Sequence, residues 1–207
     1  MHCRTSLSNV DLTSDSMTDA AQPQRADAWA LLCEWTPGDA LRRHGLAVEA
    51  AVAWYGEHRY GVGEPELDRW RMAGLLHDFD YERFPDTHPI RGAEELRRLG
   101  YPEPIVEAVL GHGDHTGMPR TTDLARTVYA CDEMSGFVIA VAYVRPNRSL
   151  DEVDLRAVTK KMKDKGFARQ VPRDQLTKGA QELGVPFEEH ITNVIEGLMT
   201  VRRDLGL

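Results

Sequence analysis

The sequence predicts an all-α protein. Apolar residues recur at spacings of three and four in one segment after another, as on the buried faces of amphipathic helices. No segment shows convincing period-two alternation, which a half-buried strand would show. Proline, glycine and capping residues divide the chain into helix-sized segments joined by short connections, as in a helical bundle. The predicted helices, in chain order, are residues 27–35, 39–59, 64–77, 87–99, 102–112, 122–144, 149–165, 172–183 and 186–205.

Turn-forming and capping residues set these helix boundaries. The turn Thr36-Pro37-Gly38 ends the first helix, and Asp39 is a good N-cap for the second. Thr87 is a plausible N-cap for the fourth helix. Ser149 and Glu152 have the spacing of a capping box, which predicts that a helix starts there.

The bulk composition limits the classes of protein. A length of 207 residues suits one domain, or one domain with an appendage. The net charge of −8 disfavours a general nucleic-acid binder, because backbone recognition needs a basic surface. The three cysteines are scattered, which indicates reduced thiols rather than a disulfide framework or a zinc finger. No apolar run approaches the roughly 20 residues that span a bilayer, and the N-terminus lacks a signal-peptide core. We therefore expect a cytoplasmic protein with neither nucleic acid nor membrane as its partner.

Four polar residues fall on predicted inward faces. These residues, His44, His77, Asp78 and Asp132, come from three different helices that a bundle can bring together. Buried imidazoles and carboxylates are costly unless they are paired or coordinate an ion. Because both groups are ligands of Zn, Mn, Fe, Co and Ni, a divalent ion would satisfy all four residues.

The order His…His-Asp…Asp on an all-α chain resembles the HD-domain superfamily of metal-dependent phosphohydrolases. The matching residues are His44, the dyad His77-Asp78 and Asp132, and the resemblance covers roughly residues 40 to 145. Longer stretches are similar to a stand-alone bacterial branch of that superfamily, which brings no known substrate with it. These stretches are HDFDYERFPDTHPIRGAEELRRLGY, HGDHTGMPR, DEMSGF and KKMKDKGFA. The resemblance implies an HD-domain helical bundle with extra C-terminal helices.

The expected domain organisation follows from this resemblance and from the composition. Residues 1–25 are polar and turn-rich, which predicts a disordered leader, and Met17 could serve as an alternative start. Residues 26–207 would form the HD domain. Its metal-binding core would span about 40–145, and a C-terminal helical extension would span about 149–207.

Two-metal members of the superfamily carry further histidines between the dyad and the last Asp. His88 and His112 stand in matching places, and His115 is an additional candidate whose role the sequence leaves open. We therefore expect one or two divalent ions, of Mn, Fe, Co, Ni, Mg or Zn. HD-GYP phosphodiesterases share a His-Pro and a His-rich turn. Here the sequence Gly117-Met118-Pro119 follows a shorter spacer, without their paired histidines, so cyclic-di-GMP hydrolysis is not expected.

The implied chemistry is metal-assisted phosphoester hydrolysis. One ion would lower the pKa of a bound water and polarise a phosphoryl oxygen, and a second would clamp the attacking and leaving oxygens. Asp78 could bridge two ions, and Asp80 or Glu82 could be the general acid. Positive side chains are expected to bind the substrate phosphate, and the candidates are Arg145, Arg148, Lys161 and Lys165.

The expected function is therefore a phosphohydrolase for a small phosphorylated substrate, such as a nucleotide or a phosphorylated metabolite. A second interpretation is a mixed-valent di-iron oxygenase, which some six-ligand HD proteins resemble. A third is a non-catalytic, metal-bound HD module that senses a nucleotide. Iron content and dioxygen consumption would identify the second, and nucleotide binding without turnover would identify the third. The oligomeric state stays open.

Overall fold

The protein is represented by a computed structural model that describes residues 22–207. Within these residues the chain forms α-helices and two short 3-10 helices and no strand, which confirms the all-α prediction. The α-helices are α1 Arg25–Trp35, α2 Asp39–His58, α3 Glu66–Leu76, α4 Ile90–Arg98, α5 Glu103–Gly111, α6 Asp123–Tyr143, α7 Leu155–Met162, α8 Arg173–Leu183, α9 Phe187–Met199 and α10 Arg202–Leu205. The 3-10 helices are η1 Asp114–Thr116 and η2 Leu150–Glu152.

The predicted disordered leader, residues 1–25, lies almost entirely outside the described residues, and so does Met17. The first helix already begins at Arg25. A capping box sets this start, because the side chain of Asp27 accepts from the backbone N–H of Gln24 and the side chain of Gln24 accepts in return.

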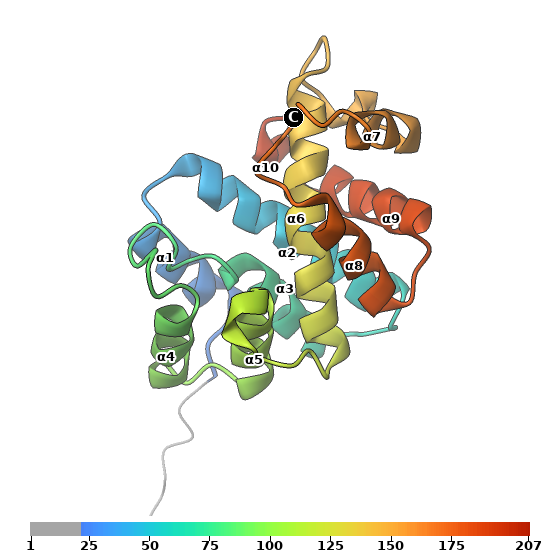
Figure 1. The fold of residues 1–207 in the computed structure, drawn as a ribbon. Coiled ribbons are helices and arrows are strands. Elements are labelled where there is room, and N and C mark those ends of the chain that lie inside the picture. The colour runs from blue at the N-terminus through green and yellow to red at the C-terminus, as the bar shows by residue number, and fades with distance from the viewer. Residues whose placement is uncertain (1–21) are drawn as a thin grey trace, which may run out of the picture.

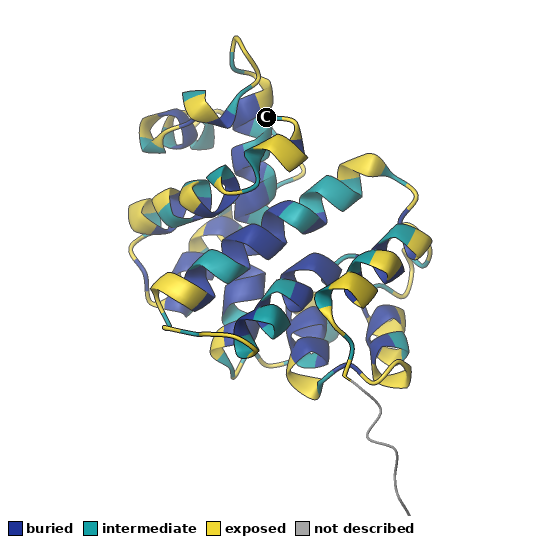
Figure 2. Cartoon of the chain, turned by 180° about the vertical axis from the view of Figure 1, so that it is seen from behind, coloured by how far each residue is buried: buried dark blue, intermediate teal, exposed yellow. Residues whose placement is uncertain are grey.

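Helix α6 is the axis around which the other helices pack. It lies against α2, α5, α8 and α9 (Figure 1). The inward faces of these helices are buried and their outward faces exposed (Figure 2). Large side chains such as Tyr55, Leu75 and Phe137 have no exposed surface. The middle of α6, which carries Asp132, is therefore enclosed by protein on most sides.

A glycine allows α2 and α3 to approach closely. A Cβ atom on Gly74 would lie 2.9 Å from backbone atoms of Val48 and Glu49, a distance that real Cβ contacts do not show. The absence of a side chain at Gly74 thus sets the separation of the two helices. Because His44 lies on α2 and His77 ends α3, the same contact sets the spacing of the histidines.

The helix predicted over residues 149–165 is divided in the structure. Residues Leu150–Glu152 form η2, the chain is extended at Val153, and α7 starts only at Leu155. The predicted capping box is wrong, because the Glu152 carboxylate accepts from the backbone N–H of Asn147 instead. The carboxylate of Asp154 accepts from Ala157 N at 2.7 Å and so provides the N-cap of α7.

The helix predicted over residues 186–205 is also divided. Helix α9 ends at Met199 and α10 begins at Arg202. The hydroxyl of Thr200 donates to the carbonyl of Gly197 at 2.7 Å. Such a local side-chain bond competes with the helical backbone pattern and favours an end there. Among the helices of residues 22–207, none combines the length and the apolar character needed to cross a membrane.

Candidate metal centre

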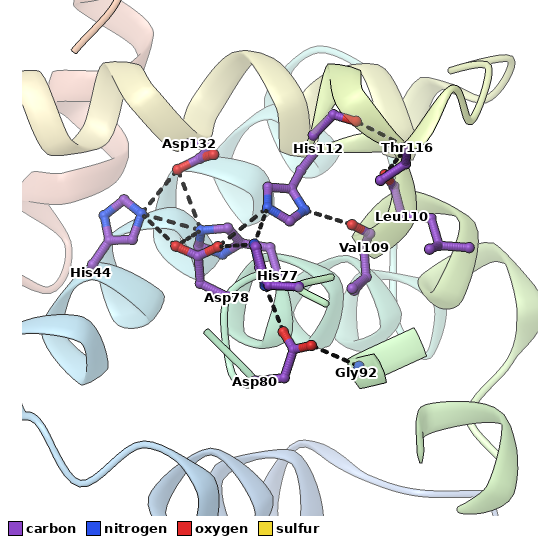
Figure 3. A network of polar contacts seen from close by, with 12 residues as sticks. His44, His77, Asp78, Asp80, Gly92, Val109, Leu110, His112, Thr116 and Asp132 are labelled. Carbon is purple, nitrogen blue, oxygen red and sulfur yellow. Dashed lines mark hydrogen bonds and ion pairs between the residues drawn. The ribbon is translucent and has the colours of Figure 1, made fainter. Parts of the chain in front are cut away.

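The four residues expected to face inward converge in the structure. His44 comes from the first half of α2, His77 is the C-cap of α3, Asp78 follows it, and Asp132 lies in the middle of α6 (Figure 3). His44 Nε2 lies 2.9 Å from Asp132 Oδ1 and 3.1 Å from His77 Nε2. His77 Nε2 lies 3.3 Å from Asp132 Oδ1 and 3.4 Å from Asp78 Oδ2. One potential ligand atom from each of the four residues therefore points to one location.

A second group of ligand atoms adjoins the first. His88, just before α4, and His112, the C-cap of α5, place their Nε2 atoms 3.1 Å apart. These atoms lie 3.1 Å and 3.2 Å from Asp78 Oδ1. Asp78 thus directs Oδ2 towards the first group and Oδ1 towards the second. The two groups share the Asp78 carboxylate and could hold two ions.

Hydrogen bonds orient three of the four imidazole rings. His77 Nδ1 lies 2.8 Å from the carbonyl oxygen of Gly74, and His112 Nδ1 lies 2.5 Å from that of Val109. His88 Nδ1 lies 2.6 Å from Asp80 Oδ1. Since these oxygens can only accept, each Nδ1 carries the proton and each Nε2 of the neutral ring presents a lone pair. This arrangement is typical of histidine metal ligands.

A cation accounts for the close approach of these lone pairs. Without one, the Nε2 atoms of His44 and His77, and those of His88 and His112, would face each other at 3.1 Å in each pair. Two neutral lone pairs would repel at that distance, so each pair needs a positive charge between its rings, either a proton on one ring or a divalent ion. The set of four imidazoles and two carboxylates suits Mn, Fe, Co, Ni or Zn better than Mg, which prefers oxygen ligands.

The electrostatics of the cluster also favour positive charge. Burial disfavours the ionised forms of Asp78 and Asp132, but His77 and the other imidazoles outweigh it and hold the pKa of each carboxyl well below its usual range. Burial lowers the pKa of His88, but its contacts with Asp78 and Asp80 outweigh burial and raise that pKa to about 9. Both ligand carboxylates are therefore anionic at neutral pH, and the site attracts cations.

A comparison with known families bears on this geometry. Residues 41–136 match the family model described as HD domain. The chain contains an HD domain. The prediction made from the histidine and aspartate pattern is thus confirmed. All six residues of the two groups lie within the matched range. Searches of curated proteins and of solved structures found no match.

HD domains bind divalent metals, and most members of the superfamily are metal-dependent phosphohydrolases. In this HD domain the two ligand groups come from α2, α3, α5 and α6 together with the loop after α3.

The structure corrects the role expected for Asp80. Its side chain has no exposed surface, and its oxygens accept from His88 Nδ1 at 2.6 Å and from the backbone N–H of Gly92 at 2.7 Å. A Cβ atom on Gly92 would lie within 2.9 Å of this carboxylate, so glycine permits the contact. With both oxygens occupied and no access to the cavity, Asp80 orients His88 and does not donate a proton to a leaving group.

Glu82 also lies elsewhere than expected. Its side chain is exposed and accepts from the backbone N–H of Gly38 at 2.9 Å. Because Gly38 is the N-cap of α2, Glu82 satisfies a free amide at that helix end. It does not line the cavity over the metal centre.

The four cations expected to bind phosphate lie away from the centre. Arg145 follows α6, thirteen residues beyond Asp132, which corresponds to ~20 Å along the helix axis. Arg148 lies further along the same connection. The ammonium of Lys161 lies over the ring of Phe167, and Lys165 is exposed in the loop after α7. None of the four lines the cavity.

A cavity of about 480 Å³ opens over the two ligand groups. Its lining includes His44, Asp78, His88, His112 and Asp132. The other lining residues are Tyr81, Gly113, Asp114, His115, Glu133 and Gln175. His115 belongs to neither ligand group, and its Nε2 lies 3.0 Å from the carbonyl oxygen of His88.

Five lining residues were not singled out from the sequence, and they are Tyr81, Gly113, Asp114, Glu133 and Gln175. Glu133 follows Asp132 directly, and among the described residues its side chain has no hydrogen-bond or ion-pair partner. Burial and then the charge of Asp132 raise the pKa of Glu133 to about 7. Tyr81 is half exposed and meets the ring of His88 edge-on at 5.2 Å. Gln175 comes from α8, beyond the range of the family match. Only the position of Glu133 beside a predicted ligand gave a signal in the sequence.

Proposed function

We propose that this HD domain is a metal-dependent phosphohydrolase that cleaves a phosphoester of a small phosphorylated substrate. The observation that carries the proposal is the division of the Asp78 carboxylate between two ligand groups. This division supports a pair of adjacent ions under one cavity, which is the arrangement used for in-line displacement at phosphorus.

The ligand residues have defined tasks in this proposal. His44, His77 and Asp132 would hold one ion, His88 and His112 the other, and Asp78 would contact both. When bound, the ions would activate water and polarise a phosphoryl oxygen. The hydrogen bonds from Nδ1 to Gly74, Asp80 and Val109 keep three of the rings in place without the ions. A preformed centre reduces the reorganisation needed at the moment of reaction.

Contacts to the substrate would come from the other lining residues. Glu133 replaces Asp80 and Glu82 as the carboxylate next to the reacting group, since it borders the cavity and has no protein partner. Gln175 could donate a hydrogen bond to a phosphate oxygen, and His115, whose Nε2 donates to the carbonyl of His88, could accept one from the substrate at Nδ1. The exposed ring of Tyr81 could cover an apolar part of the leaving group. A volume of about 480 Å³ suits a metabolite-sized substrate.

The test combines metal analysis with a substrate panel. Protein purified without chelator would be analysed for bound metals, then assayed on phosphomonoesters and phosphodiesters with Mn, Co, Ni, Mg or Fe. We expect up to two ions per chain and turnover of at least one ester, with no turnover by Asp78→Ala. Nucleotide binding without turnover under every metal would contradict the proposal and favour a sensing module.

One observation supports a second candidate, the di-iron oxygenase. No lysine or arginine lines the cavity among the described residues, although phosphoryl groups are usually bound by such side chains. A substrate with little negative charge would suit this lining. Two iron atoms per chain, together with substrate-dependent dioxygen consumption and no phosphate release, would establish this alternative.

A further inference from the structure

One end of the molecule concentrates positive charge. Residues 145–173 contain nine lysines and arginines against four aspartates and glutamates, a net charge of +5 in a chain whose net charge is −8. Four of the five lysines of the chain lie between Lys160 and Lys165. The rest of the sequence uses arginine almost throughout. We call residues 143–173 the basic end.

Most cations of the basic end are exposed and form no ion pair within residues 22–207. Arg156, Lys160 and Lys163 lie on one exposed face, opposite the buried Ala157 and Val158. Lys165 and Arg169 are exposed in the following loop. Within residues 22–207 none of these five cations forms an ion pair.

Several exposed arginines elsewhere on the surface are paired with acidic side chains. Arg97 pairs with Glu103, Arg98 with Glu95, and Arg126 with Asp123. In the basic end the acids are used locally instead, since Asp154 caps α7 and Asp164 accepts from the backbone N–H of Gly166. The positive charge of this surface is therefore available to a partner.

Exposed apolar side chains adjoin these cations. Tyr143 and Val144, at the end of α6, are 45% and 54% exposed. They begin the connection that projects beyond the other helices at this end of the molecule, with α7 close beside it (Figure 1). Arg145, Pro146 and Arg148 follow in the same connection. An exposed aromatic residue and an exposed valine thus directly precede the cations of this connection.

We propose that the basic end docks on an anionic phospholipid surface. Clustered lysines act as strongly hydrated point charges and suit a diffuse layer of negative headgroups, whereas arginine is preferred for nucleic acids. Tyrosine is enriched at membrane interfaces, where its ring enters the headgroup region and its hydroxyl stays hydrated. The expectation of no membrane partner rested on the lack of a spanning segment, and a surface contact does not need one.

Docking in this way would leave the metal centre open. Tyr143 lies eleven residues beyond Asp132 on α6, which corresponds to ~16 Å along the helix axis. The remaining, acidic part of the chain would be repelled by anionic lipids. The basic end therefore determines the orientation, with the cavity set back from the lipid surface.

The first test measures partition of the full-length protein onto vesicles. Vesicles of phosphatidylcholine alone would be compared with vesicles that contain about 30% phosphatidylserine, at low and high salt. We expect binding only to the anionic vesicles, weakening as salt is raised. The triple variant Lys160→Gln, Lys163→Gln, Lys165→Gln should reduce partition by about a hundredfold, since each cation near the surface contributes about fivefold.

A matched variant removes the same charge elsewhere. Arg91→Gln, Arg97→Gln, Arg98→Gln changes three exposed arginines of α4 and should leave partition close to that of the wild type. Failure to bind anionic vesicles would overturn the proposal. Equal partition of the lysine triple variant and the wild type would overturn it as well.

The second test separates lipid from other polyanions. Tyr143→Ser with Val144→Ser should weaken vesicle binding by about tenfold or more, because it removes the apolar contact. Leu99→Ser, which changes another exposed apolar side chain, should have no effect. Tighter binding of single-stranded RNA than of vesicles, lost in the lysine triple variant and unchanged in the Tyr143/Val144 variant, would overturn the proposal in favour of a nucleic-acid surface.

Discussion

His88 Nδ1 lies 2.6 Å from Oδ1 of Asp80, a carboxylate that has no exposed surface. The other Asp80 oxygen accepts from the backbone N–H of Gly92 at the start of α4. Asp80 therefore couples the position of α4 to the orientation of a metal-ligating ring. The two ligand groups differ in this respect, since the other oriented rings donate to backbone carbonyls.

We expect Asp80→Asn to weaken the second ion selectively. The asparagine side chain has one acceptor oxygen, whereas the carboxylate accepts from both His88 Nδ1 and the backbone N–H of Gly92. One of these two donors therefore loses its partner. Loss of such an orienting carboxylate typically lowers metal affinity by about 10–100-fold. Titration with Mn should show the first ion retained and the second weakened. Asp86→Asn, on an exposed residue of the same loop, is the control. Unchanged affinity for two ions in Asp80→Asn would contradict the assignment.

The position of Asp78 between the two ligand groups predicts how many ions each ligand variant binds. Asp78→Ala should lower affinity for both ions, since each group loses its shared anion. His44→Gln should affect only the first ion and His112→Gln only the second. Elemental analysis after saturation and desalting distinguishes these outcomes. Two full equivalents of metal in Asp78→Ala would show that the groups do not share that carboxylate.

Glu133→Gln should reduce turnover without changing metal content. Glu133 borders the cavity but belongs to neither ligand group. If it assists proton transfer at the leaving group, its loss lowers kcat by about a hundredfold or more. The measurement is kcat on the best ester of the panel, with metal analysis in parallel. Glu196→Gln, on the exposed side of α9, should keep wild-type kcat, and a wild-type kcat in Glu133→Gln would exclude the role.

Lys161→Met and Lys165→Met should leave kcat/KM for a small substrate in solution unchanged. Neither lysine lines the cavity, and Lys161 packs on Phe167 instead. Gln175→Ala, by contrast, should raise KM because it removes a hydrogen-bonding group from the cavity wall. A fall of about tenfold in kcat/KM for either lysine variant would show that the α7 region reaches the substrate.

His190 should make the fold sensitive to acid. Burial lowers the pKa of His190 from 6.5 to about 4, while its ring contacts Tyr55 and the carbonyl oxygen of Ala130. Between those values the unfolded chain binds more protons at this position than the folded chain. The free energy of unfolding should therefore fall as pH drops from about 6.5 to about 4, by at most roughly 3 kcal/mol from this residue.

Urea unfolding of the metal-free protein across this range would measure the effect. His190→Gln should show a shallower loss of stability on acidification than the wild type. His58→Gln, on an exposed histidine, should retain the wild-type slope. Parallel pH profiles of His190→Gln and the wild type would show that His190 is not held neutral in the fold.

The residues that helical periodicity placed inward are those the structure brings together. His44 and Asp132 lie within apolar stripes, so their direction followed from the spacing of their neighbours. The dyad His77-Asp78 was placed by the end of a periodic segment. His88 and His112 were expected from the resemblance to two-metal HD proteins, and the structure sets them against Asp78.

Most errors about the site concern segments without periodicity. The loop from Phe79 to Thr87 gave no inward direction, so the burial of Asp80 and the contact of Glu82 with Gly38 could not be predicted. The phosphate candidates were proposed for their positive charge, and no pattern in the sequence gave their distance from Asp132. The second half of α6 separates Arg145 and Arg148 from that residue. Gln175 reaches the cavity only through the packing of α8 on α6, which no local pattern encodes.

The close contact of α2 and α3 at Gly74 has a consequence for the order of assembly. His44 on α2 and Asp132 on α6 are separated by 88 residues in the chain, and together with His77 at the end of α3 their ligand atoms meet only after three helices have docked. An ion bound there would cross-link two positions at the ends of a long loop. The cross-link lowers the conformational entropy of the unfolded chain and so favours the folded state. Binding of a spectroscopically visible ion such as cobalt would therefore report when the helices dock during refolding. Metal binding would then raise the free energy of unfolding of the chain, independently of any turnover.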